Sequence, residues 1–159
     1  MSIYDIEVTQ INGEPQKLSD YKDKYMIIVN TASECGLVGQ LEDLEELYQE
    51  LKGEGVIVLG FPSNQFMNQE PLDNAEIQSF CQTSYNVSYP LYEKIDVNGA
   101  SAHPLYKHLV KETKNKKIKW NFTKFLVAPN EESITRFAPT TSPKKVKKEI
   151  QTLIKSNQS

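Results

Sequence analysis

A strand, a helix and a second strand follow one another early in this sequence, and they leave the chain few possible architectures. The apolar run at residues 26–29 predicts a buried strand. Four leucines and a tyrosine recur at helical spacing across residues 40–51, which predicts an amphipathic helix. Residues 56–61 form a second apolar strand. Two strands joined by a helix pair in parallel through a right-handed crossover, so we expect an α/β sheet.

Flanking segments extend this unit at both ends. Residues 5–18 alternate around an Asn12-Gly13 turn and predict an N-terminal hairpin. Two apolar segments at residues 125–128 and 134–137 predict another hairpin around Pro129-Asn130.

Further helices and one short strand are expected between and after these segments. Asp73 with Glu76 resembles a capping box, Pro104 fits a first helical position, and Ser142 fits an N-cap. Residues 92–97 predict a short strand before an Asn98-Gly99 turn. The sum is an α/β thioredoxin-like fold, with a mixed central sheet flanked by helices and an N-terminal β-hairpin.

The length and composition fit this single unit. At 159 residues with 38% hydrophobic content, we expect one thioredoxin-like domain over residues 1–159. No stretch approaches the roughly 20 apolar residues of a membrane span, and the first residues lack the pattern of an export signal. Two cysteines are too few for a disulfide framework, so we expect a cytoplasmic protein. The net charge of −3 gives no reason to expect a nucleic-acid partner.

Several kinds of functional site are missing from the sequence. It contains no phosphate-binding glycine loop and no cluster with metal-ligand spacing, so we expect no cofactor and no metal. His103 and His108 lie on or beside one predicted helix, where we expect both on the surface.

Cys35 lies between the predicted strand and the predicted helix, which places it near free backbone N–H groups that favour a thiolate. A buried structural cysteine and a nucleophile are both compatible with this position. Val38 stands where a Cys-x-x-Cys motif would have its second cysteine, which argues against a thioredoxin-like reductase. A helix end contributes only about 0.3–1 kcal/mol, so a nucleophile also needs hydrogen-bond donors. Gln69 and Trp120 offer neutral ones.

Six ordered blocks of the sequence resemble the glutathione peroxidase family over nearly the full length of the chain. The resemblance implies that Cys35 is the peroxidatic nucleophile and that Gln69, Trp120 and Asn121 donate hydrogen bonds around its sulfur. The blocks are residues 30–36, 59–66 with 69–71, 94–99, 103–106, 119–127 and 136–143.

The resemblance also implies a reaction. The thiolate of Cys35 attacks a hydroperoxide, either hydrogen peroxide or an organic one, and becomes a sulfenic acid. Phe80-Cys81-Gln82 is similar to the context of the resolving cysteine in family members that use thioredoxin. Cys81 is therefore expected to form a disulfide with Cys35. A buried core thiol beside Ile77 and Phe80 is the alternative, and one helix can satisfy both descriptions.

The resemblance implies thioredoxin rather than glutathione as the reductant, and the scarcity of arginine agrees with this. Arg136 is the only arginine among 18 basic residues, so paired guanidinium contacts to glutathione's carboxylates are scarce. The short loop at residues 111–119 stands where tetrameric relatives carry an insertion, so we expect a monomer. Its lysines, and those at 144–148, are expected to be solvated rather than to hold the protein on a membrane.

Two other functions compete with this one. In a redox relay, Cys35 would be oxidised by peroxide and would pass the disulfide to a partner protein. In a binding module with an inactive centre, Cys35 would be no more reactive than free cysteine. Both alternatives keep the same fold.

Overall fold

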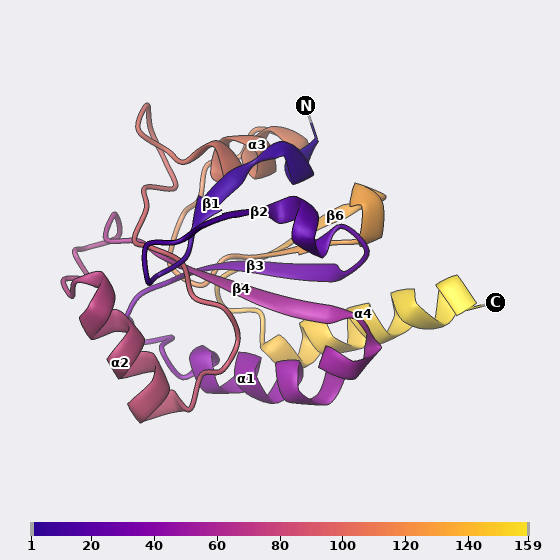
Figure 1. Cartoon of the computed structure of the whole chain (residues 1–159), viewed down its shortest axis with the longest axis horizontal. Helices are drawn as coiled ribbons and strands as arrows, with labels where there is room; N and C mark the ends of the chain where they lie inside the picture. Colours follow the sequence, from indigo (N-terminus) through magenta and orange to yellow (C-terminus); the bar gives the residue numbers. More distant parts are fainter. Residues whose placement is uncertain (1, 159) are drawn as a thin grey trace.

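A four-stranded mixed sheet lies at the centre of the molecule, as predicted (Figure 1). The structure is a computed structural model that describes residues 2–158. The strand order is β4-β3-β5-β6, in which β3 is parallel to β4 and antiparallel to β5, and β6 is antiparallel to β5. The strands are β3 Tyr25–Thr31, β4 Val56–Pro62, β5 Lys124–Val127 and β6 Ile134–Phe137.

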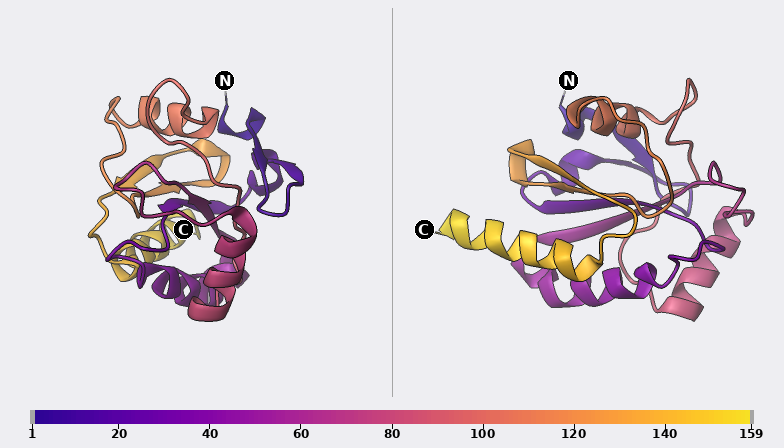
Figure 2. Two further views of the ribbon diagram at one scale, coloured as in Figure 1. Left: turned by 90° about the vertical axis from the view of Figure 1, so that its left-hand side faces the viewer. Right: turned by 180° about the vertical axis from the view of Figure 1, so that it is seen from behind.

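Helices cover both faces of the sheet, because the side chains of a strand point alternately to the two sides. Ile27 and Val29 of β3 pack into a core with α1 and α4, here called the α1-side core, which also holds Leu44 and Val146. Met26 and Ile28 pack into the opposite core with α3 and the N-terminal hairpin. Figures 1 and 2 show α1 beside α4 on one face and α3 on the other. The helices are α1 Gln40–Leu51, α3 Pro104–Glu112 and α4 Pro143–Gln158.

The N-terminal hairpin is confirmed. Its strands, β1 Glu7–Thr9 and β2 Pro15–Lys17, pair antiparallel. Gly13 adopts a φ of +94° in the connecting turn, a conformation that favours glycine. Short 3₁₀ helices occupy Ile3–Asp5, Leu18–Tyr21, Lys52–Glu54 and Pro129–Glu131.

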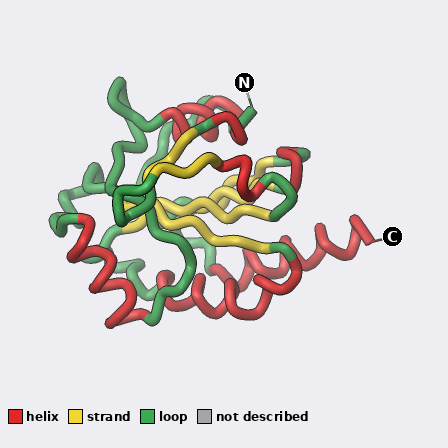
Figure 3. The backbone as a smooth tube through the Cα atoms, in the orientation of Figure 1, coloured by secondary structure: helices red, strands yellow, loops and turns green. Residues whose placement is uncertain are grey.

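The helix α2, Asn74–Tyr85, lies beyond the end of the sheet where the loops gather (Figure 3). Asp73 and Glu76 form the predicted capping box at its start. Asn86, with a φ of 56°, ends it in a left-handed conformation. Ile77 and Cys81 are the buried residues of this helix, and Phe80 and Tyr85 pack against the α1-side core while partly exposed.

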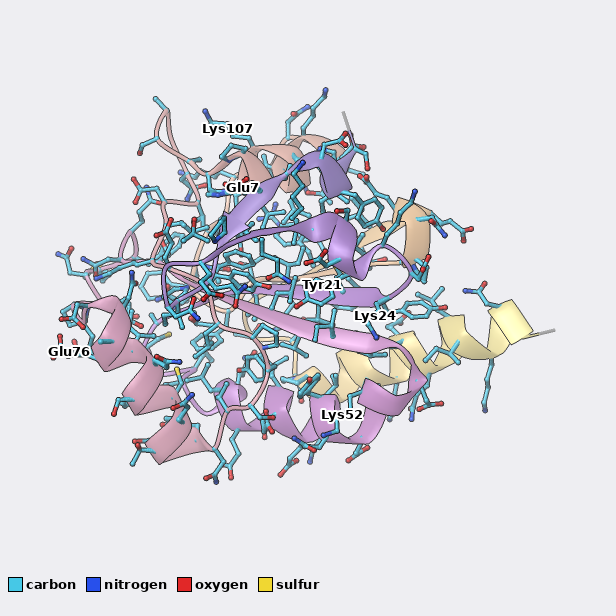
Figure 4. The ribbon with its side chains drawn as sticks, in the orientation of Figure 1. Glu7, Tyr21, Lys24, Lys52, Glu76 and Lys107 are labelled. Atoms are coloured by element: carbon cyan, nitrogen blue, oxygen red, sulfur yellow. The ribbon has the colours of Figure 1, made fainter. Side chains whose placement is uncertain are left out.

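The outer surfaces of the helices are polar. Glu76 on α2 and Lys107 on α3 are exposed and point away from the sheet (Figure 4). Within residues 2–158, no helix has the length and apolar character needed to cross a membrane.

The predicted strand at residues 92–97 is wrong. Only isolated bridges form here, between Tyr92 and Gln10 and between Leu91 and Gly60. Backbone and side-chain acceptors alternate along this segment. The N–H groups of Tyr92 and Ile95 donate to the carbonyls of Gly60 and Pro62 in β4, each at 2.9 Å. Asn74 Oδ1 accepts from the Lys94 N–H at 2.9 Å, and Gln65 Oε1 accepts from the Val97 N–H at 2.6 Å. These two side-chain bonds interrupt the backbone pairing with β4 and leave the segment irregular.

Candidate active site

The loops after β3 and β4 leave the sheet at the same edge, since the two strands are parallel and Thr31 pairs with Pro62. The first loop carries Cys35 and the second carries Gln69. The Glu34 N–H donates to the Gln69 carbonyl oxygen at 2.9 Å, so the two loops are joined directly beside the cysteine.

The surroundings of Cys35 differ from the sequence prediction in one respect. The thiol is 3% exposed, but it does not lie at the amino end of a helix, because α1 begins only at Gln40. A turn encloses the sulfur instead. The Leu37 N–H donates to Cys35 Sγ at 3.4 Å, and the Val38 N–H donates to the Cys35 carbonyl at 3.0 Å. A single loop amide therefore replaces the helix end that the sequence led us to expect.

A tight turn presents Gln69. Met67 and Asn68 have φ values of 56° and 53°, in the left-handed region that non-glycine residues rarely adopt. The Gln69 N–H closes the turn on the Phe66 carbonyl at 3.2 Å. Strain of this kind persists where the surroundings fix the backbone, and it is common at functional sites.

The segment with Trp120 and Asn121 is held by a buried asparagine of β3. Asn30 donates from Nδ2 to the Trp120 carbonyl at 3.1 Å and accepts from the Thr123 N–H at 3.1 Å. The Phe122 N–H adds a bond of 2.7 Å to the Asn30 carbonyl. Asn30 therefore fixes this segment against the strand that leads to Cys35.

Two of the predicted donors contact each other. Asn121, which is fully buried, donates from Nδ2 to Gln69 Oε1 at 3.0 Å. Asn121 Oδ1 is buried and has no partner among the described residues. Exchanging O and N in both amides gives a second arrangement, in which Gln69 donates to Asn121. Either arrangement leaves one amide NH₂ free to donate within the site.

Trp120 packs, partly buried, against the cores on both faces of the sheet. Its ring is partly buried against the α1-side core, which includes Cys35, and its centroid is 5.8 Å from that of Phe66. Among the described residues, no indole or side-chain amide donates to Cys35 Sγ in this conformation, and the bond to sulfur comes from the backbone N–H of Leu37. Two of the predicted donors, Gln69 and Asn121, thus contact each other, and the segment of Gln69 is bonded to the cysteine loop.

Cys81 belongs to the same apolar core as Cys35, and both cysteines are free. Its thiol is 2% exposed, and burial raises its pKa to about 12, with a further contribution from the charge of Glu70. Ile77 is buried beside it on α2, as the sequence predicts, while Phe80 is only partly buried. Cys81 is therefore a core residue that shares one apolar core with Cys35.

The sequence analysis missed two buried charged residues. Glu70 follows Gln69 and is 1% exposed. Lys124 is fully buried at the start of β5, where Nζ donates to Gln40 Oε1 at 2.8 Å and to the carbonyls of Ala138, Pro139 and Thr141. The only signal for Lys124 in the sequence is its place directly before an apolar strand.

Both histidines also differ from the surface positions expected for them. His103 accepts the Leu105 N–H at 3.0 Å through Nδ1 and so caps α3. His108 pairs with Glu131 at 2.6 Å, and the two side chains are 9% and 18% exposed. His103 stabilises the start of α3, and His108 joins α3 to the segment that carries Glu131. No group of three His, Cys, Asp or Glu residues suited to a metal occurs in the described part of the chain.

Known proteins resemble this chain along most of its length. Residues 3–110 match the family model described as glutathione peroxidase. A glutathione peroxidase homolog BsaA from Halalkalibacterium halodurans is 52% identical over 157 residues, which cover 97% of this chain and 100% of that protein. A glutathione peroxidase from Lactococcus lactis subsp. cremoris is 49% identical over 157 residues, with the same coverage of 97% and 100%.

Solved structures agree with this result. The crystal structure of Trgpx in apo form is 40% identical with a TM-score of 0.80, and the match covers 98% of this chain and 96% of that one. That of T. cruzi GPX1 is 34% identical with a TM-score of 0.78, covering 97% of each chain. A thioredoxin-family thiol:disulfide interchange protein from Chlorobium tepidum has a TM-score of 0.73 at 12% identity, covering 97% and 96%. The predicted thioredoxin-like fold is therefore confirmed.

Proposed function

The chain belongs to the glutathione peroxidase family and is a peroxidase, and from this premise we propose that Cys35 is its peroxidatic nucleophile and thioredoxin its reductant. Gln69, Trp120 and Asn121 act in this proposal as the donors that stabilise the charged sulfur. Hydrogen peroxide and organic hydroperoxides are the substrates.

The hydrogen bond between Asn121 and Gln69 supports this assignment most directly. It joins two of the three proposed donors at 3.0 Å, and the backbone of Gln69 is bonded to Glu34, the neighbour of Cys35. Each hydrogen bond to a charged group is worth about 1.5–3 kcal/mol, so two such donors suffice to stabilise a thiolate at neutral pH. In this proposal the cysteine loop moves toward the free amide to complete the set.

The first half of the reaction breaks the peroxide bond. The Cys35 thiolate attacks the terminal oxygen of ROOH, the O–O bond breaks, and the RO⁻ group takes a proton and leaves as an alcohol. Cys35 is oxidised to a sulfenic acid, and the peroxide is reduced. The neutral donors then face the new S–OH group and the departing oxygen.

The second half requires a thiol, and we assign it to Cys81. Its sulfur attacks Cys35–SOH, a disulfide forms, and the hydroxyl leaves with the thiol proton as water. A disulfide needs Cα atoms within about 7 Å, so α2 must open if the helix holds Cys81 farther away. The few buried residues of α2 make such local opening inexpensive.

The dithiol of thioredoxin then reduces the disulfide and is itself oxidised. The position of Arg136 supports thioredoxin over glutathione. Its guanidinium already donates to the carbonyls of Lys116 and Lys117 at 2.5 and 2.6 Å, so the one arginine of the chain is engaged within its own fold. A monomer in the cytoplasm, where such thiols are kept reduced, completes the proposal.

The test is NADPH consumption with hydrogen peroxide, in parallel thioredoxin and glutathione systems. Wild type should turn over with thioredoxin. Cys35→Ser should be inactive in both systems, and Cys81→Ser should lose only the thioredoxin-driven turnover. Turnover by the wild type in the glutathione system but not in the thioredoxin system would contradict the assigned reductant.

The same experiment separates a peroxidase from a redox relay. A relay would show slow turnover with thioredoxin and would accumulate mixed disulfides with other proteins. Mass spectrometry after one equivalent of peroxide should show a Cys35–Cys81 disulfide. Overoxidised Cys35 beside a free Cys81 thiol would count against resolution by Cys81.

A further inference from the structure

The carboxylate of Glu70 joins the two loops of the candidate site. It is 1% exposed, and Ser33 approaches it twice. The Ser33 N–H donates to Oε2 at 2.9 Å, and the Ser33 hydroxyl donates to Oε1 at 2.6 Å. Glu70 directly follows Gln69, and Ser33 precedes Cys35 by two positions.

The rest of Glu70 is fixed as firmly as its carboxylate. Its N–H donates to Asn64 Oδ1 at 3.0 Å, and its carbonyl accepts from Lys94 Nζ at 3.1 Å. Burial raises the pKa of this carboxyl, while the bonds from Ser33 and the charge of Lys94 lower it. A buried carboxylate is costly unless donors satisfy it, and here the donors come mainly from the cysteine loop.

We propose that Glu70 is a positioning residue for the peroxidase reaction. It fixes the loop of Cys35 at a set position relative to Gln69. The bond from the Glu34 N–H to the Gln69 carbonyl, at 2.9 Å, adds a third link between the same two loops. These three hydrogen bonds connect the loop that carries Cys35, the proposed nucleophile, to the loop that carries Gln69, its proposed amide donor. This inference rests on the proposed function, because it gives the Glu70–Ser33 contact a role in that reaction.

The molecule contains a second contact of the same kind, which provides a matched control. Glu45 of α1 is 8% exposed, and Ser88 donates to it through its N–H at 2.8 Å and its hydroxyl at 2.6 Å. This pair joins α1 to the segment after α2 and does not involve the loop of Gln69. Substituting Glu45 therefore measures what loss of such a contact does to the fold alone.

The experiment measures the rate of Cys35 oxidation by hydrogen peroxide, with Cys81→Ser present throughout to prevent resolution. Glu70→Gln and Ser33→Ala should each slow oxidation by about tenfold to a hundredfold, since small misplacements of reacting groups have effects of this size. Ser33→Thr keeps the hydroxyl and should stay within about threefold of the parent rate. Glu45→Gln should lower the urea midpoint about as much as Glu70→Gln, with an unchanged rate of oxidation.

The direction of the change separates positioning from simple charge. Removing a nearby negative charge favours a thiolate, so charge alone would make Glu70→Gln faster and leave Ser33→Ala unchanged. An unchanged or faster Glu70→Gln, or an equal slowing by Glu45→Gln, would overturn the positioning role. If Glu70→Gln does not fold, Ser33→Ala against Ser33→Thr decides the question, and equal rates for these two variants would overturn the role.

Failure of the proposed function would look different. A parent protein whose Cys35 reacts no faster than free cysteine would overturn both the peroxidatic role of Cys35 and the role of Glu70. A fast parent with an equally fast Glu70→Gln would overturn the inference about Glu70 alone.

Discussion

Asn121 Nδ2 donates a 3.0 Å hydrogen bond to Oε1 of Gln69, which joins residues that are 52 positions apart in the sequence. The two segments meet because each is fixed to the sheet near Cys35. Asn30 of β3 holds residues 120–123, and the Glu34 N–H holds the carbonyl of Gln69. The donors of the proposed site therefore depend on backbone contacts that do not involve the sulfur.

Substituting Asn30 should damage the site and the fold together. Asn30→Ala removes the side-chain acceptor of the Thr123 N–H and the donor to the Trp120 carbonyl. The Trp120 carbonyl still accepts from the Thr123 hydroxyl at 3.0 Å, so the Thr123 N–H is the group left without a partner, at a cost of about 1–3 kcal/mol. We expect a loss of this order in the free energy of unfolding, measured with urea, and a fall of at least about tenfold in peroxidase activity.

Asn98 provides the control for this prediction. Its side chain bridges the backbone of Ile118 in the same way, with bonds of 2.7 and 2.9 Å. Asn98→Ala should reduce stability with a much smaller effect on activity. Equal losses of activity in the two variants would mean that Asn30 acts only through stability.

Cys81 should make stability depend on pH in the alkaline range. Burial raises its pKa to about 12, against a reference value of 9.0. Between these values the folded protein keeps a proton that the unfolded chain has lost. The free energy of unfolding therefore falls as pH rises above about 9. Cys81→Ala should show a weaker decline in urea unfolding between pH 8 and 10.5, and identical slopes would refute the prediction.

Lys124 should act in the opposite direction. Burial lowers its pKa to about 8 from 10.5. Between these values the unfolded chain binds more protons, so this residue makes the free energy of unfolding rise with pH. Lys124→Met should lose that rise and should be less stable by about 1–3 kcal/mol at pH 7, where buried carbonyls lose their donor. Exposed Lys107, substituted by Met, should leave the pH profile as it is.

The helix α2 should open more readily than α1. Six of the 12 residues of α1 are buried, whereas α2 buries Ile77 and Cys81. Amide hydrogen exchange should therefore be faster in α2 than in α1, and faster still after oxidation by peroxide. Equal protection in the two helices would contradict resolution by an opening of α2.

Much of the fold could be predicted because apolar periodicity dominates it. The helix predicted at residues 40–51 occurs as Gln40–Leu51, since its leucines repeat at the spacing of one helical face. The prediction of a strand at residues 92–97 was wrong because the partners of its backbone are far away in the sequence. Its backbone pairs only in part with β4, and the N–H groups of Lys94 and Val97 donate to the side chains of Asn74 and Gln65, which only the tertiary structure brings there.

In the candidate site, too, some residues could be predicted from the sequence and others only from the tertiary structure. Cys35 was identified by its position between strand and helix and Gln69 as a neutral donor, while the resemblance to a family added Asn121. The structure brings Gln69 and Asn121 into contact. Glu70 and Lys124 were missed because a charged residue in a sequence is normally exposed, and nothing local reveals that distant donors or acceptors surround it. The position of Cys35 between strand and helix was predicted, but the turn at residues 35–38 that brings the Leu37 N–H to its sulfur was not.

The central claim is that neutral donors make the sulfur of Cys35 a fast nucleophile toward peroxide. The most direct measurement is the second-order rate constant for its reaction with hydrogen peroxide at pH 7, in Cys81→Ser and in the same protein with Gln69→Ala. We predict a parent rate roughly a thousandfold above that of free cysteine, and a loss of at least about tenfold with Gln69→Ala. A parent rate within tenfold of free cysteine, or no effect of Gln69→Ala, would contradict the account.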